Sequence, residues 1–191
     1  MNSAWISSLF FVVIGSTVLS AQVPSKLAGK TGAPQASRIH FAPGVRAVIE
    51  SNTPEGALAR TWVRYVQGLT GEAGVQLEDV VTADVHCVEL EAAGYPPGIA
   101  GLRQFRRQIN AALPDESEIV TQMQFSGPGM IETELYVTGT HLGELMGHPA
   151  TGRTVRFVIH TLGRFKGDRL VERWDRTDFA GLLRQLDTSP Q

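Results

Sequence analysis

The chain has 191 residues, of which 42% are hydrophobic and 19% are charged, and its formal net charge is −2. This length and composition are typical of one globular domain with extensions and exclude an intrinsically disordered chain. The nearly balanced charge excludes strong attraction to nucleic acid or to an acidic membrane surface, so no nucleic-acid partner is expected.

The N-terminal segment is the most hydrophobic part of the chain. Residues 4–21 read AWISSLFFVVIGSTVLSA, without a charged residue. This run is marginal in length for a membrane-spanning helix, and it ends in small residues that suit signal peptidase. We expect residues 1–21 to be a signal peptide that directs the protein to secretion or to the periplasm. The alternative is an uncleaved anchor, which would attach the protein to a membrane.

The following residues, 22–53, are rich in Pro, Gly, Ser, Ala and Gln and lack clear periodicity. They predict a linker, in which VRAVIE at 45–50 is the one candidate for a short strand. The folded domain is expected at 54–187, with residues 188–191 as a tail.

The domain begins with helical patterns. Thr53 can cap a helix, Pro54 suits its first turn, and Gly71 suits its end. A short helix near 75–81 and a strand around 84–90 follow. A second long helix is predicted within 96–115, and its apolar stripe is Ile99, Leu102, Phe105, Ile109 and Leu113. The arginines that lie away from this stripe, namely Arg103, Arg106 and Arg107, are expected on a solvated face.

From residue 118 the period changes to two. Residues 118–127, 129–141, 152–165 and 168–175 predict four strands, and their short links indicate an antiparallel meander. Residues 178–186 predict a closing helix with Asp178 as its cap. The fold class is therefore α+β: a curved antiparallel sheet wraps around the N-terminal helices as a cone-shaped α+β barrel. Its apolar interior is a natural pocket for a small hydrophobic molecule.

Three stretches in this order resemble a known family: PPGIAGLRQF with ALPD, then GTHLGELMGHPATGRTV, then GRFKGDRLVERWDRTDFAGLLRQL. Together they resemble the SnoaL-like polyketide cyclases, or ester cyclases, of the nuclear-transport-factor-like superfamily. The resemblance covers about residues 54–187. It implies an intramolecular aldol ring closure or an isomerisation of a small hydrophobic carbonyl compound, and it implies a homodimer.

Asp175, in ERWDRTD, takes the position of the family's acid/base aspartate. A carboxylate against apolar walls has its charged form disfavoured, and we expect this to raise its pKa toward the range useful for proton exchange. The alternative is that Asp175 or Asp178 only caps the last helix. His141 is the second catalytic candidate because alternation places it on the apolar face with Ile131 and Leu135; it could equally be a core histidine.

Several residues are expected to line the substrate pocket. His86 and Cys87 lie where relatives often hold a polar residue, and which of the two faces the pocket is left open. Phe157, Ile159 and Thr161 share one alternating face, and His160 points to the other. Trp174, next to Asp175, completes the predicted set.

No metal or cofactor is expected. The histidines show no metal-ligand spacing, the single cysteine cannot form a cysteine-based zinc site, and no glycine-rich phosphate loop or nucleophile elbow occurs. The alternative to an enzyme is a module of the same fold that binds a hydrophobic ligand, or dimerises, without catalysis.

Overall fold

The computed structural model describes residues 38–187, which belong to a compact unit that begins at Ala36. The expected signal segment, residues 22–37 of the expected linker and the tail 188–191 lie outside the described residues. No helix within 38–187 is long and apolar enough to span a membrane.

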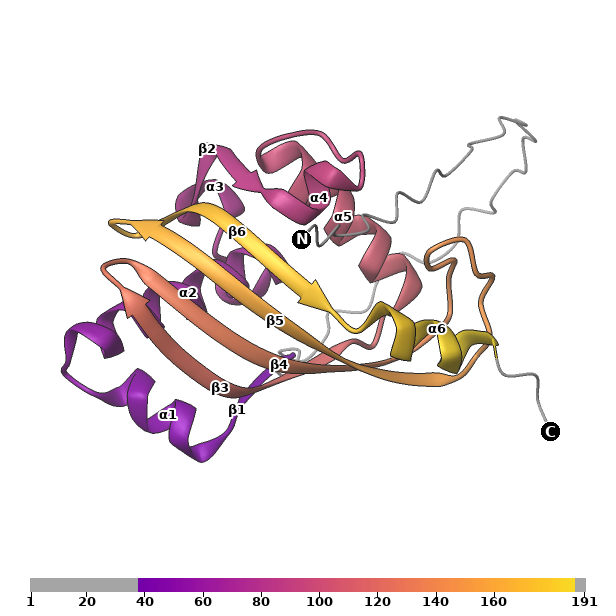
Figure 1. Cartoon of the computed structure of the whole chain (residues 1–191), viewed down its shortest axis with the longest axis horizontal. Coiled ribbons are helices and arrows are strands. Elements are labelled where there is room, and N and C mark those ends of the chain that lie inside the picture. Colours follow the sequence, from indigo (N-terminus) through magenta and orange to yellow (C-terminus); the bar gives the residue numbers. More distant parts are fainter. Residues whose placement is uncertain (1–37, 188–191) are drawn as a thin grey trace, which may run out of the picture. The chain divides into compact units, whose positions relative to one another are not determined.

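A six-stranded curved sheet forms the centre of this unit, in the order β1-β3-β4-β5-β6-β2 (Figure 1). Its four central strands form the predicted antiparallel meander: β3 (Ser117–Gly127), β4 (Met130–Thr140), β5 (Thr154–Lys166) and β6 (Arg169–Thr177). The edge strands differ from the prediction because both pair in parallel, β1 (Ile39–Phe41) with β3 and β2 (Val81–Cys87) with β6. The sheet does not close into a barrel, although the α+β class is confirmed.

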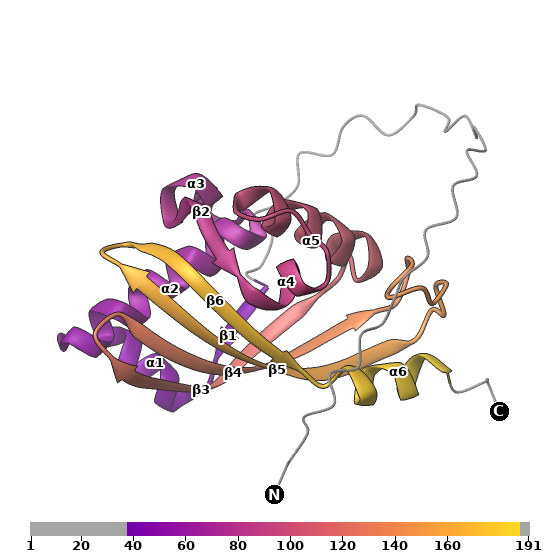
Figure 2. The ribbon, with the colours of Figure 1, turned by 45° about the horizontal axis from the view of Figure 1, so that its top comes forward.

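Helices cover the concave face of the sheet (Figure 2). The two long ones are α2 (Pro54–Thr70) and α5 (Ile99–Ala112). Shorter helices are α1 (Pro43–Glu50), the single turn η1 (Glu72–Gly74), α3 (Leu77–Val80) and α4 (Val88–Ala92). The last helix, α6 (Phe179–Asp187), packs along β5 beyond the point where β6 ends.

The predicted ends of two helices are confirmed. Thr53 Oγ1 accepts a hydrogen bond from the Gly56 N–H at 3.1 Å, and α2 ends at Gly71, whose φ of 74° suits glycine. At the other end of the domain, the Asp178 carboxylate accepts from the Gly181 N–H at 2.8 Å and caps α6. Asp178 is therefore a structural residue.

The sequence prediction was wrong over 45–50, which form most of α1 and not a strand. Its β-branched residues suggested a strand, but Val45 and Ile49 are four residues apart and both pack against the core. Similarly, the strand expected at 84–90 stops at Cys87, and α4 takes up the following residues. Folded structure therefore reaches into the range expected to be a linker.

The core lies between the concave face and the helices, and the alternation of the strands decides which side chains enter it. On β4 the inward residues Ile131, Thr133, Leu135 and Val137 are all buried, as predicted. Two grooves lie away from the centre of this face. One, of about 700 Å³, lies between the start of α2 and the turns after β3 and β5; the other, of about 260 Å³, lies between α1 and β3. Neither is lined by a predicted site residue.

Candidate functional site

A row of three polar side chains crosses the concave face of the sheet. Thr133 on β4 lies opposite Thr161 on β5, and Thr161 lies opposite Asp175 on β6. Thr133 and Thr161 are buried, and the Asp175 side chain is only 14% exposed. Because opposite residues on paired strands share a face, this register brings together groups that are 42 residues apart in the chain, from position 133 to position 175.

Arg173 holds Asp175 in a two-point ion pair. The Arg173 Nε donates to Asp175 Oδ1 at 2.9 Å, and Nη2 lies 2.8 Å from Oδ2. The Thr161 hydroxyl also donates to Oδ1, at 2.8 Å. The sequence prediction surrounded this carboxylate with apolar walls; the structure places a buried guanidinium against it. Asp175 is therefore an oriented anion, with contacts that fix both of its oxygens.

Tyr65 continues this network on α2. Its Oη accepts a hydrogen bond from Arg173 Nη1 at 2.8 Å, and its ring packs edge-on against Phe165. Burial raises the pKa of Tyr65, so the phenol stays neutral near neutral pH. From the other side, the Asp175 N–H donates to Glu89 Oε2 at 2.7 Å, which ties α4 to β6.

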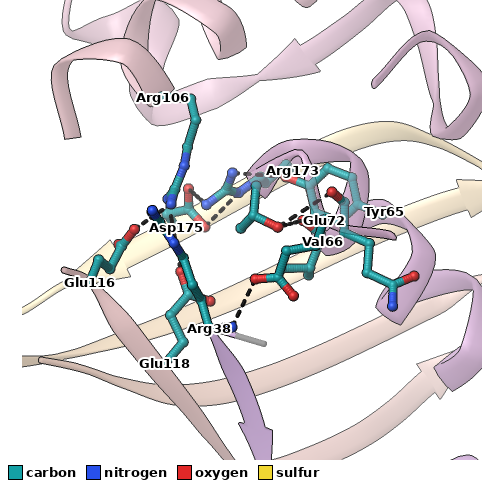
Figure 3. A network of polar contacts seen from close by, with 11 residues as sticks. Arg38, Tyr65, Val66, Glu72, Arg106, Glu116, Glu118, Arg173 and Asp175 are labelled. Atoms are coloured by element: carbon teal, nitrogen blue, oxygen red, sulfur yellow. Dashed lines mark hydrogen bonds and ion pairs between the residues drawn. The ribbon is translucent and has the colours of Figure 1, made fainter. Parts of the chain in front are cut away.

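A second charged cluster lies on the same face, and Figure 3 shows it around the guanidinium group of Arg106. Arg106 Nη2 forms an ion pair with Glu116, and Nη1 lies 4.0 Å from Glu118 Oε1. All three side chains are buried, so the expected solvated position of Arg106 was wrong. Helix α5 turns this arginine toward the sheet, where two carboxylates compensate its charge.

The buried Glu118 carboxyl retains its proton unusually well. Burial, followed by the negative charge of Glu116, raises its pKa to about 7, and the charges of Arg106 and Arg173 oppose this shift. Arg106 contacts Glu116 more closely than Glu118. Two of the interior carboxyl groups therefore have different surroundings: Asp175 is in a two-point ion pair with Arg173, whereas Glu118 has a raised pKa and is near its midpoint at neutral pH.

His86 and Cys87 point in opposite directions. The His86 side chain is exposed, and its Nδ1 lies 2.6 Å from Glu91 Oε1. Cys87 is buried, and the charges of Arg173 and Asp175 act on its thiol. Burial raises the pKa of this thiol to about 11. Of the predicted pair, Cys87 therefore faces the interior.

The structure does not bring His141 to Asp175. His141 is buried, as its alternation suggested, but it follows Thr133 by eight residues, which is roughly 26 Å along a strand. There its Nδ1 lies 3.1 Å from Thr151 Oγ1, and burial lowers its pKa. His141 is therefore a neutral histidine at the end of the core that lies away from Asp175.

The other predicted pocket residues divide between the two faces. Phe157 and Thr161 are buried on the concave side, and Ile159 lies between them on the same face. Trp174 lies opposite Leu162 in the register, one position away from the Thr161–Asp175 pair. Its side chain therefore belongs to the other face of the sheet and does not join the network.

Two buried polar atoms near these clusters have no hydrogen-bond partner in the described part of the protein: Thr133 Oγ1 and Arg106 Nε. Both groups can donate a hydrogen bond to an oxygen atom of a bound molecule. Among residues 38–187, no group of three His, Cys, Asp or Glu side chains is placed to hold a metal ion.

The sequence reasoning missed Tyr65, Arg173, Glu116 and Glu118. Two signals were available. Arg173 is two residues from Asp175 in a strand, which places it on the same face, and Glu118 alternates with the buried Val120. Tyr65 had no comparable signal because it follows Trp62 by three residues on a helix that was interpreted only as core.

The fold and this network define an α+β protein with a charged, buried interior on the concave face of its sheet. The sequence model of the SnoaL-like polyketide cyclase family matches residues 61–186. The chain belongs to this family. No curated protein matches the chain in sequence.

Solved structures confirm the fold. TsrD from Streptomyces laurentii is 18% identical, with a TM-score of 0.62 over 71% of this chain and 98% of its own. A SnoaL-like polyketide cyclase from Agrobacterium tumefaciens is 24% identical, with a TM-score of 0.56 over 68% and 97%. IdmH from Streptomyces antibioticus is 24% identical, with a TM-score of 0.56 over 69% and 99%. At these identities the likeness concerns the fold alone.

Proposed function

We propose that the chain is a polyketide-cyclase-like enzyme that closes a ring in, or isomerises, a small hydrophobic carbonyl compound by acid/base chemistry. The observation that supports this most directly is the oriented Asp175 carboxylate on the concave face, held by Arg173 and Thr161. An anionic carboxylate in a fixed position can take a proton from a carbon next to a carbonyl group.

In the proposed reaction, Asp175 removes a proton from the carbon next to one carbonyl group of the substrate. The resulting enolate carbon attacks a second carbonyl carbon and forms the new carbon–carbon bond. The oxygen of that second carbonyl then takes up a proton, so the product is an isomer of the substrate. The unpaired Thr133 hydroxyl is on the same face and can donate a hydrogen bond to a substrate oxygen.

The test is turnover of a panel of linear diketones by the full chain, with ring-closed products identified by mass spectrometry and NMR. Asp175→Asn keeps the shape of the side chain but removes its basicity, and we expect it to lower turnover by at least about 100-fold. Asp168→Asn, the same change on an exposed turn carboxylate, is the matched control and should keep full activity. An Asp175→Asn variant as active as the control would refute the proposal.

A non-catalytic binding module is the second candidate, and one observation favours it. Both oxygens of Asp175 are engaged within the protein, which is also what a purely structural ion pair would show. In that case hydrophobic ligands would bind the wild type and Asp175→Asn with the same affinity, and no compound of the panel would be converted. Calorimetric titration of both proteins beside the turnover assay separates the two functions.

A further inference from the structure

The interior contains a second carboxyl group that the proposed reaction of Asp175 does not use. Glu118 lies at the start of β3, with its side chain 11% exposed, and shares the guanidinium group of Arg106 with Glu116. It also lies within reach of the charge of Arg173, the partner of Asp175. The two ion-paired clusters therefore occupy one interior.

Charges in this interior are unequal. The ion pairs described above contain two guanidinium groups, Arg106 and Arg173, and three carboxyl groups, those of Glu116, Glu118 and Asp175. Two further carboxylates add negative charge: Glu89 accepts a hydrogen bond from the Asp175 N–H, and Glu72 acts on Glu118. Glu116 is in close contact with Arg106, and Asp175 is in two-point contact with Arg173. Glu118 is left with the longest ion-pair contact, 4.0 Å, and it is the group that can retain a proton at the smallest electrostatic cost.

Unpartnered donors lie on the same face. Only 4% of Thr133 is exposed, and within residues 38–187 its hydroxyl has no hydrogen-bond partner. Arg106 Nε also lacks a partner among these residues. Thr133 is on β4, the strand between β3, which contains Glu118, and β5, which pairs with the strand of Asp175. Across the sheet, the strand of Thr133 therefore lies between the strands of the two carboxyl groups. Along the strands, Glu118 is opposite Val137, four residues from Thr133, so a molecule that contacts both carboxyl groups and the Thr133 hydroxyl runs diagonally over the sheet.

We propose that Glu118 is the acid of this site, which gives its proton to the oxygen of the second carbonyl group while Asp175 acts as the base. This inference rests on the proposed function and extends it to a substrate with two carbonyl groups that spans β3 to β6. The carbon–hydrogen proton goes to Asp175, the new carbon–carbon bond forms, and the Glu118 proton goes to the alkoxide. After product release the proton on Asp175 returns to Glu118, which balances the cycle.

Glu118 is better suited to the role of the acid than Tyr65, whose buried phenol is the alternative proton donor. Burial raises the pKa of Tyr65 further above neutrality, whereas the pKa of Glu118, about 7, lets it give up a proton at neutral pH. The groups that act on Glu118 are Glu116, Arg106, Arg173 and Glu72.

The first experiment needs no substrate. Carboxyl-carbon NMR of the full chain, assigned with Glu118→Gln, follows the Glu118 titration. We expect a midpoint near pH 7, and a lower midpoint in Glu116→Gln, because that change removes a neighbouring negative charge and frees Arg106. A midpoint near the ordinary value of 4.5 would overturn the inference whether or not any compound is converted.

The second experiment separates the two carboxyl groups, with 2,6-heptanedione and its longer homologues as probes in D2O. Exchange of hydrogen for deuterium next to a carbonyl group needs only the base, whereas ring closure needs the acid as well. We expect Glu118→Gln to keep exchange but to lose ring closure by at least about 100-fold, and Asp175→Asn to lose both. Glu132→Gln, on the exposed face of β4, is the matched control.

The outcomes distinguish the two proposals. Ring closure by Glu118→Gln at the wild-type rate would overturn the role of Glu118 and leave the proposed function intact. Absence of both exchange and closure in the wild type would count against the proposed function. In an active wild type, ring closure should decline as pH rises through about 7, when Glu118 loses its proton, and Glu118→Gln should lack this decline.

Discussion

Cys87 shows how burial decides the chemistry of a single side chain. It lies in the interior beside the Arg173–Asp175 pair, and burial raises the pKa of its thiol to about 11. Because only the thiolate form is nucleophilic, and almost none of Cys87 is in this form near neutral pH, its side chain is unreactive there.

We therefore expect iodoacetamide at pH 8 to label Cys87 in the folded chain no faster than the chain unfolds. In urea the same thiol should react at the rate of an ordinary cysteine. Mass spectrometry of the time course measures both. Rapid labelling under native conditions would show that the interior at Cys87 is open to solvent.

For single residues, the sequence predicted side-chain positions well in the strands, where side chains alternate between the two faces. It placed Phe157, Ile159 and Thr161 on one face and His160 on the other, because successive side chains in a strand alternate. It could not choose between His86 and Cys87, because β2 is an edge strand with a register shift between its pairs to β6. It also could not show that Arg106 is buried, because the compensating carboxylates come from another element.

Among the elements, the two hairpin turns of the meander make a matched comparison. Gly129, between β3 and β4, has a φ of 71°, and a Cβ there would lie 2.3 Å from the Phe165 carbonyl oxygen. Gly167, between β5 and β6, has a φ of 64° but no neighbour within 4 Å of such a Cβ. The first turn is therefore constrained by conformation and by close approach, the second by conformation alone.

We expect Gly167→Ala to lower the free energy of unfolding by about 1–2 kcal/mol, the cost of a left-handed conformation for a residue with a side chain. Gly129→Ala should cost about 1 kcal/mol more, because it also disturbs the Phe165 N–H to Gly129 carbonyl hydrogen bond. Urea denaturation of both variants measures the difference. Equal costs would mean that Gly129 and Phe165 can move apart at this turn without any loss of stability.

The prediction of helices and strands succeeded where one hydrophobic periodicity dominates a segment. It failed where the helical and the strand pattern compete. The four long strands and the helices α2, α5 and α6 follow strong periods and were found within a few residues of their ends. Helix α1 was missed because its β-branched residues favour a strand, whereas its packing of Val45 and Ile49 on the core favours a helix.

For the whole molecule, Glu118 couples stability to pH. Its pKa is raised in the folded chain from the ordinary 4.5 to about 7, so between these values the folded chain binds more protons than the unfolded chain. Its contribution is complete below about pH 4.5 and is lost as pH rises through about 7. The free energy of unfolding should therefore fall over this window, by about 1–3 kcal/mol from this group.

Urea denaturation of the wild type and of Glu118→Gln between pH 4.5 and 8 measures this contribution. The variant should lack this fall and should become the more stable protein, relative to the wild type, as pH rises. The difference between the two proteins is the relevant quantity, because burial lowers the pKa of His141 and gives the opposite slope at acidic pH. A difference that does not change with pH would contradict a raised pKa of Glu118.

The sequence by itself determined the α+β class, the antiparallel meander, the family resemblance and the position of Asp175, because these depend on periods and motifs within short stretches. Only the tertiary structure decided what surrounds Asp175. Tyr65, Arg106 and Glu118 come from a long helix, a second helix and an inner strand (Figure 3). Their distances depend on how the sheet curves beneath those helices (Figure 2). Charge pairing and burial act through space, and a pattern along the chain does not contain that information.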